Sequence, residues 1–284
     1  TQTRLRFELA LPAAGRALSV RVTITNDSLS DTLSLDECNL TLPIPDHLEG
    51  FTDLSGRWGL EFQSQGHSLT QIEYSRENRT GRSSHRGAAS VIVHETPLSE
   101  PQGQALACHL AWSGNHRVRI EQLTDGRRYC QLGELLTPEE IVLQPGTTYS
   151  SPTVWCVFSD EGFSGLSRQW HRLIREQFPT VAALQHKPRP VQINTWEALY
   201  FDVKESTLLN LIEQAAQLGV ERFVLDDGWF AGRNDDRSSL GDWWADPIKL
   251  PRGLAPLIAA CNQFDMEFGL WIEPEMVSPD SELY

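Results

Sequence analysis

One stretch decides how the C-terminal third of the chain folds: Val220-Glu221-Arg222-Phe223-Val224-Leu225-Asp226-Asp227-Gly228-Trp229. Its residues up to Leu225 are typical of a buried β-strand, and two carboxylates follow directly. In α/β barrels, the loops that follow the strands build the rim where chemistry is done. Aspartate oxygens accept hydrogen bonds from vicinal hydroxyls and an indole covers the apolar face of a sugar ring, so this sequence favours a sugar site. A helix cap or a turn is the alternative, because Asp is common after strands for that reason alone.

The neighbouring segments repeat the pattern of strand, helix and strand. Val191–Trp196 is expected to be a first strand, Glu205–Leu218 an amphipathic helix, and Val220–Asp226 the second strand. After a long loop, a second helix is expected near residues 254–264 and a third strand at Glu267–Ile272. This order implies a parallel sheet with right-handed crossovers. Each strand then delivers Trp or an acid to one rim, which indicates a carbohydrate site that draws on Trp196, Glu197, Asp226, Asp227, Trp271, Glu273 and Glu275.

The first half of the chain has a different pattern. Short runs, several with alternating apolar residues, are separated by turn signals such as Thr124-Asp125-Gly126, which predicts an antiparallel β-sandwich over residues 1–160. Residues 161–188 are expected to form a linker, with a helix followed by an extended lead-in, and residues 189–284 to begin a barrel. The strands are expected at Leu5–Leu11, Ala17–Thr25, Gln71–Tyr74, Ser90–His94, Ala105–Trp112, Arg117–Gln122 and Thr148–Val157.

Composition argues against several classes of protein. The 284 residues carry a formal net charge of −14, whereas a nucleic-acid partner would need a basic surface. No run of about 20 apolar residues is present, so no membrane-spanning helix is expected. The five cysteines are widely spaced and mostly inside apolar strands, which favours buried free thiols and a reducing cytoplasm over a disulfide framework. The eight histidines lack the spacing of a zinc site, and neither a metal nor a cofactor is expected.

Two further features each have a functional and a plain interpretation. The acidic loop with Asp235, Asp236, Asp242 and Asp246 has oxygens suited to a divalent cation, but its spacing does not match an EF-hand loop. A solvated loop is therefore preferred for the first two residues, and Asp242-Trp243 is placed close to the sugar site. Leu54-Ser55-Gly56-Arg57-Trp58 is expected to be a loop. An exposed indole on a loop, here Trp58, is often a binding element, and local packing is the alternative.

Four motifs resemble those of the glycoside hydrolase family 36 α-galactosidases, the bacterial raffinose and melibiose hydrolases. The resemblance is highly specific over about residues 187–284 and looser upstream. It implies a β-sandwich domain followed by a (β/α)8 TIM barrel, of which this chain would hold the first three βα units. The motifs are Asn194-Thr195-Trp196-Glu197-Ala198, Phe223-Val224-Leu225-Asp226-Asp227-Gly228-Trp229-Phe230, Leu240-Gly241-Asp242-Trp243 and Gly269-Leu270-Trp271-Ile272-Glu273-Pro274-Glu275-Met276-Val277.

The resemblance also implies roles for individual residues. Trp196, Asp226, Asp227 and Trp271 would line the galactose pocket, and the aspartates would hold the axial and primary hydroxyls. In tetrameric relatives, a loop tryptophan in the setting of Trp58 reaches a neighbouring subunit's active site. The catalytic carboxylates would follow later strands, with the nucleophile in a Lys-Trp-Asp segment, and no such segment occurs in this sequence. Because three strands cannot close an eight-stranded barrel, we expect a fragment, cut at both ends and inactive by itself.

For the parent enzyme, the resemblance implies retaining hydrolysis of terminal α-1,6-linked galactose from raffinose-family oligosaccharides and melibiose, by a homotetramer. Retention needs two carboxyls about 5–5.5 Å apart, and adjacency alone does not make Asp226 and Asp227 that pair. One alternative is galactosyl transfer, as in raffinose and stachyose synthases, where a sugar acceptor replaces water. The other is a non-catalytic galactose-binding module, which predicts galactose binding by the 284-residue chain itself.

Overall fold

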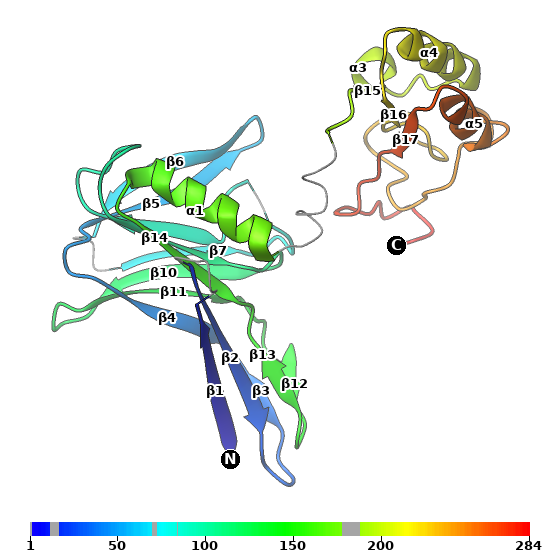
Figure 1. The fold of residues 1–284 in the computed structure, drawn as a ribbon. Helices are drawn as coiled ribbons and strands as arrows, with labels where there is room; N and C mark the ends of the chain where they lie inside the picture. The colour runs from blue at the N-terminus through cyan, green and yellow to red at the C-terminus, as the bar shows by residue number, and fades with distance from the viewer. Residues whose placement is uncertain (1, 12–16, 70–72, 84, 178–187) are drawn as a thin grey trace. The chain divides into compact units, whose positions relative to one another are not determined.

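The computed structural model describes residues 2–11, 17–69, 73–83, 85–177 and 188–284. The chain divides into two compact units, Thr1–Leu184 and Gln185–Tyr284, and each is described by itself (Figure 1). The first unit is built mainly of β-strands, and the second combines strands with helices.

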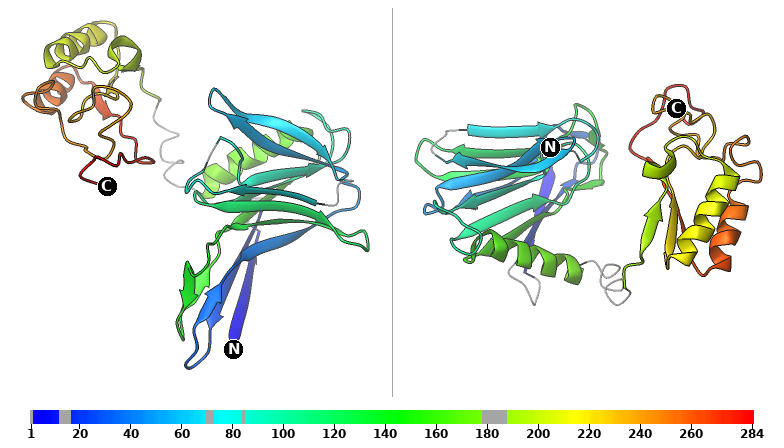
Figure 2. Two further views of the ribbon diagram at one scale, coloured as in Figure 1. Left: turned by 180° about the vertical axis from the view of Figure 1, so that it is seen from behind. Right: turned by 90° about the horizontal axis from the view of Figure 1, so that it is seen from above.

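The first unit is an antiparallel β-sandwich, which confirms the prediction from the sequence. Its strands are β1 (Thr3–Ala10), β2 (Ala17–Asn26), β3 (Leu33–Leu35), β4 (Cys38–Ile44), β5 (Gly50–Arg57), β6 (Leu60–Ser68), β7 (Glu73–Asn78), β8 (Ser90–His94), β9 (Ala105–Leu110), β10 (His116–Gln122), β11 (Arg128–Glu134), β12 (Ile141–Leu143), β13 (Thr148–Ser150) and β14 (Val154–Ser159). The larger sheet has the order β1-β2-β14-β9-β8-β5-β6, with β13 beside β2. A second sheet, β4-β11-β10-β7, packs against it, and β3 pairs with β12 (Figure 2).

Apolar side chains from both sheets form one core between them. In β10 and β11, the inward positions carry Val118, Ile120, Cys130 and Leu132, each at most 3% exposed. These residues pack with side chains of the larger sheet such as Val154. All five cysteines of the chain are buried and free. Because successive residues of a strand point to opposite faces, the positions between these inward residues remain nearer the surface.

Helix α1 (Gly162–Gln177) belongs to the first unit rather than to a linker. It packs Leu166 and Leu173 on Ala107 and Val157, on the face of the larger sheet that points away from the sandwich core (Figure 1). The expected extended lead-in lies largely outside the described residues. At 16 residues, α1 is the longest helix of the described part of the chain, and none there is long and apolar enough to cross a membrane.

The expectation of a loop before Trp58 is wrong. Leu54 lies inside β5, and Trp58 occupies the tip of the β5–β6 hairpin, where it is 83% exposed. The strand was not predicted because its sequence does not alternate between apolar and polar residues: β5 buries Thr52 and Asp53 as well as apolar residues. The buried Asp53 carboxylate is paired with Arg76 at 2.8 Å, which offsets its desolvation.

The second unit contains three parallel strands in the order β15-β16-β17. Ile193, Phe223 and Phe268 stand in register across the sheet. Leu208 and Leu257, from helices after the first two strands, are fully buried with Phe223 in one core. The predicted alternation of strands and helices is confirmed by β15 (Gln192–Asn194), α3 (Trp196–Leu199), α4 (Glu205–Gln217), β16 (Arg222–Leu225), α5 (Ala255–Gln263) and β17 (Glu267–Leu270).

The first of these strands is shorter than predicted. The Asn194 side-chain oxygen accepts a hydrogen bond from the backbone N–H of Trp196 at 2.7 Å. Thr195 has already left the extended conformation, with φ −82° and ψ −10°. Trp196 therefore opens the short helix α3 instead of closing β15.

Candidate functional site

Asp226 is the first residue after β16, and it joins the ends of two neighbouring strands. Its backbone N–H donates to the Thr195 hydroxyl at 3.0 Å. Its Oδ2 accepts a hydrogen bond from the Asn194 side-chain amide, and its Oδ1 accepts one from the backbone N–H of Asp227 at 2.7 Å. The carboxylate is only partly buried. It is therefore held in place from both strands and still faces solvent.

Asp227 occupies a different environment, although it is the next residue. It is 7% exposed and forms a two-pronged ion pair with Arg233. Arg233 donates from Nε to Oδ1 at 2.9 Å and from Nη2 to Oδ2 at 2.7 Å, and the Gly228 N–H adds a third hydrogen bond to Oδ1 at 2.7 Å. A forked guanidinium pair of this kind fixes the carboxylate in direction as well as in charge.

The Arg233 side chain is itself enclosed. It is 4% exposed, and its guanidinium carbon lies 5.5 Å from the ring centre of Phe201 and 5.6 Å from that of Phe230. Its remaining nitrogen, Nη1, donates to the Ser238 carbonyl at 2.7 Å. Aromatic faces stabilise a desolvated cation, so the ring contacts and the Asp227 carboxylate together offset the cost of burying this charge.

A second pair of charged groups holds the long loop after β16. Lys249 donates from Nζ to the carbonyls of Gly228 at 2.9 Å and Arg233 at 2.6 Å. Burial lowers the pKa of Lys249, and the nearby carboxylates of Asp246 and Asp227 oppose that effect. For Asp246, burial acts to raise the pKa, but hydrogen bonds from three backbone N–H groups outweigh it and hold the pKa below its ordinary value. These contacts fix the loop that carries Arg233.

Gly228 is required where the strand turns into this loop. Its φ is +95°, a conformation that side chains rarely adopt. A Cβ at this position would approach the Phe201 Cα to 3.0 Å and the Tyr200 carbonyl oxygen to 3.2 Å. The glycine therefore allows the loop to pass close to the segment that follows α3.

The tryptophans predicted to bind sugar belong to a series of ring contacts that passes through the two phenylalanines beside Arg233. Trp196 lies against Phe201, with ring centres 5.2 Å apart. Phe230, the other ring that contacts the Arg233 guanidinium, has its ring centre 4.8 Å from that of Trp243, and the ring centres of Trp243 and Trp271 are 6.4 Å apart. Buried Trp229 holds the segment that follows β17 in place, because its indole N–H donates a hydrogen bond to the Trp271 carbonyl at 2.9 Å.

The two remaining predicted site residues are Asp242 and Trp58. Asp242 accepts a hydrogen bond at 2.9 Å from the backbone N–H of Glu282, so it fixes the C-terminal segment. Trp58 belongs to the first unit. In the acidic loop, Asp235 pairs with Arg237 at the surface. Across the described ranges, no group of three or more His, Cys, Asp or Glu residues could hold a metal ion.

Sequence reasoning missed Arg233 and Lys249. A single basic residue inside a polar loop has no periodic pattern that would reveal its burial. The charge balance held a weak signal, because the stretch from Asp226 to Asp246 is acidic and a buried carboxylate needs a cation nearby.

Arg233→Met should lower the free energy of unfolding of the second unit by about 3–5 kcal/mol, because it leaves the Asp227 carboxylate buried and unpaired. Arg237→Met is the matched control, since it breaks an Arg–Asp pair whose arginine is 82% exposed, and it should change little. Adding Asp227→Asn to Arg233→Met should restore part of the loss. Urea unfolding followed by tryptophan fluorescence measures all three variants. Equal stability of the Arg233 and Arg237 variants would contradict the assignment.

Asp246→Asn tests the charged contacts of the loop through their pH dependence. The folded-state pKa of Asp246 lies below its ordinary 3.8, so the carboxylate stabilises the fold fully above that pH and loses its effect as the pH falls through the lowered pKa. The variant should be about 1 kcal/mol less stable than the wild type at neutral pH. The difference should narrow below pH 3.8. A difference that stays constant across the acid range would show that the charge of Asp246 is irrelevant.

The sequence matches the models of two protein families and is similar to several known proteins. The glycosyl hydrolase family 36 N-terminal domain model matches residues 1–144, and the melibiase model matches residues 148–284. The α-galactosidase of Escherichia coli is 43% identical over 281 residues, covering 99% of this chain and 39% of that protein. The α-galactosidase AgaA of Geobacillus stearothermophilus is 40% identical over 233 residues, which cover 81% of this chain and 32% of AgaA.

Solved structures of AgaA have the same fold. One superposes with a TM-score of 0.90 at 34% identity, covering 99% of this chain and 39% of AgaA. An AgaA variant in complex with stachyose gives a TM-score of 0.90 at 33% identity with the same coverage. The chain thus spans about two fifths of the length of these relatives. On the strength of both family models and these similarities, the chain belongs to glycosyl hydrolase family 36.

Proposed function

We propose that the full-length protein is a retaining α-galactosidase that removes terminal α-1,6-linked galactose from raffinose-family oligosaccharides and melibiose. The observation that carries the proposal is the rim of the second unit, where a solvent-facing carboxylate at Asp226 adjoins the fixed Asp227 carboxylate. Similarity to α-galactosidases supports it, because solved structures of AgaA variants contain stachyose and raffinose.

Counting lone pairs shows what these two carboxylates can offer a sugar. An ionised carboxylate has about four acceptor positions. Among the described residues, Asp226 uses one on each oxygen, which leaves one on each. Asp227 uses two on Oδ1 and one on Oδ2, so a single position on Oδ2 remains. We assign the free positions to galactose hydroxyls, with the stronger contribution from Asp226.

The aromatic residues would complete the binding surface. Trp196 and Trp271 are both partly exposed and follow strands at the same end of a parallel sheet. Indole faces pack well on the C–H groups of a pyranose, and Trp243 supports Trp271 from the side. In this proposal, the described rim binds and orients the terminal galactose.

The bond-breaking step requires groups beyond this rim. In double displacement, a carboxylate attacks the anomeric carbon while an acid protonates the leaving oxygen, and water then releases the sugar. We place both catalytic carboxyls on later strands of the full-length barrel. The fixed charge on Asp227 and Asp226 would contribute by hydrogen bonds that strengthen as the oxocarbenium ion forms.

The assembly and the cellular location are also proposals. We propose a homotetramer in which Trp58 contacts a neighbouring subunit, since an 83% exposed indole at a hairpin tip is well placed for such a contact. A cytoplasmic location is favoured by five buried cysteines that all remain free.

Asp226→Ala in the full-length enzyme should reduce kcat/KM for a chromogenic α-galactoside by about 30- to 1,000-fold, the loss expected for charge-assisted hydrogen bonds to the transition state. Asp235→Ala, which removes a surface carboxylate of the same loop region, should stay within about twofold of the wild type. Activity of the Asp226 variant within a few-fold of the wild type would remove Asp226 from the site. Product analysis with raffinose separates hydrolysis, which releases galactose, from transfer, which builds longer oligosaccharides.

The chain 1–284 by itself should show no turnover of the same substrate, because binding groups without an attacking carboxylate and a proton donor cannot cleave the glycosidic bond. Purification from a host that lacks α-galactosidase makes the assay decisive. Turnover above background would mean that a catalytic pair exists among the acids of residues 188–284.

A further inference from the structure

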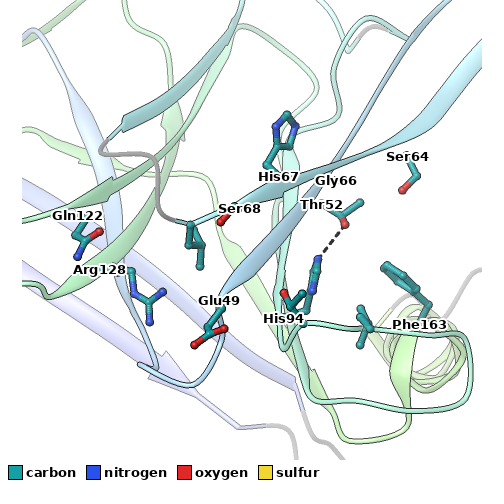
Figure 3. Close-up of a pocket in the computed structure, with 13 residues that line it drawn as sticks. Glu49, Thr52, Ser64, Gly66, His67, Ser68, His94, Gln122, Arg128 and Phe163 are labelled. Atoms are coloured by element: carbon teal, nitrogen blue, oxygen red, sulfur yellow. Dashed lines mark hydrogen bonds between the residues drawn. The ribbon is translucent and has the colours of Figure 1, made fainter.

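We propose that a pocket in the first unit is a non-catalytic binding site for a short, uncharged oligosaccharide. The inference goes beyond the proposed function and does not depend on it. The pocket has a volume of about 690 Å³, within the range of about 300–1,000 Å³ that is usual for small-molecule sites. Its lining includes Glu49, Thr52, Gly66, His94, Gln122 and Phe163 (Figure 3).

The strand register explains which side chains face this pocket. Thr52 and Gly66 are direct partners on β5 and β6, and their side of the sheet is opposite to Phe51, which is buried in the sandwich core. His67 stacks on Phe51 with ring centres 4.5 Å apart, and Figure 3 shows it turned away from the other lining residues. Thr52 and Gly66 therefore line the pocket from the face of the larger sheet that points away from the core, while Gln122 and Arg128 reach it from the adjoining ends of β10 and β11 in the second sheet.

Several polar groups in the pocket have hydrogen-bonding capacity to spare. Within the described part of the chain, the side chains of Glu49, Ser64 and Gln122 make no hydrogen bond. His94 is fixed instead, because its two ring nitrogens contact the Thr52 hydroxyl at 3.1 Å and the Glu95 carbonyl at 2.6 Å. A carboxylate, an amide and a hydroxyl together offer the mixture of donors and acceptors that sugar hydroxyls require.

The apolar and charged groups narrow the class of ligand further. Phe163, at the start of α1, lies with its ring centre 6.3 Å from that of His94 and supplies an aromatic surface for sugar C–H groups. Glu49 and Arg128 place one charge of each sign in the same pocket. A strongly anionic or cationic ligand would meet repulsion from one of them, whereas an uncharged polyol would not.

Gly66 provides a direct way to close the pocket. Its backbone is in an ordinary conformation, and a Cβ added there would meet no atom within 4 Å. A larger side chain at this position would therefore extend into the pocket without disturbing the sheet. On β6, the adjacent Gln65 points to the opposite face and is exposed, so it is the natural control position.

Calorimetric titration of the chain 1–284 with raffinose, an uncharged trisaccharide, tests the inference. All variants carry Asp226→Ala, which weakens sugar binding at the rim of the second unit equally in each of them. We expect saturable binding that Gly66→Tyr weakens about tenfold or more and that Gln65→Tyr leaves unchanged. Glu49→Gln, at an exposed residue, should weaken binding about three- to tenfold through loss of a charge-assisted hydrogen bond.

Two results would overturn the inference. One is the absence of saturable binding by the chain that carries Asp226→Ala alone. The other is binding that neither Gly66→Tyr nor Glu49→Gln weakens. Circular dichroism of each variant confirms folding, and the exposed Glu49 keeps the test informative even if Gly66→Tyr perturbs β6. The binding test is independent of the proposed activity: if the full-length protein proved not to be an α-galactosidase, binding of raffinose in this pocket would still stand or fall on these titrations.

Discussion

The buried ion pair between Asp227 and Arg233 is the interaction on which the rim of the second unit depends. Both side chains are less than 10% exposed, and two hydrogen bonds join them. Arg233 also stands at the centre of a row of contacts that begins at Trp196 and ends at Trp271. Substitution of this arginine would therefore change the packing of both tryptophans.

The energetics of such a pair explain why it organises the rim more than it stabilises the fold. Removing two charges from water costs several kcal/mol per ion, and their attraction roughly repays that cost when the geometry is good. Breaking the pair, in contrast, leaves an uncompensated buried charge. The pair thus makes one arrangement of the loop much better than the others. A carboxylate held in this way needs no reorganisation when a ligand arrives, which is the property expected of a preorganised binding group.

The sequence was sufficient to predict the β-sandwich of the first unit and the alternation of strands and helices in the second. The strand before Asp226 has a strong apolar pattern, and the three strands pair in parallel as the alternation with helices predicts. The sequence was not sufficient where contacts of individual side chains decide the local structure against the pattern of apolar residues. Strand β5 escaped notice because it buries Thr52 and Asp53, and Trp196 left its strand because an Asn194 side chain caps the following turn.

The difference between the two aspartates could not be predicted for the same reason. Their sequence positions are adjacent, yet only Asp227 reaches the arginine from the loop beyond. The pocket of the first unit was equally hidden, since its lining comes from residues scattered between Glu49 and Phe163. Such sites arise from register and side-chain direction, which apolar periodicity does not encode.

In the proposed site, Asp226 faces the sugar while Arg233 holds Asp227 in place beside it. A crystal structure of the full-length enzyme with bound galactose tests this most directly. We expect galactose on the rim between Trp196 and Trp271, hydrogen-bonded to Asp226, with both hydrogen bonds between Arg233 and Asp227 intact. Galactose bound away from this rim, or an Arg233 side chain withdrawn from Asp227, would contradict it.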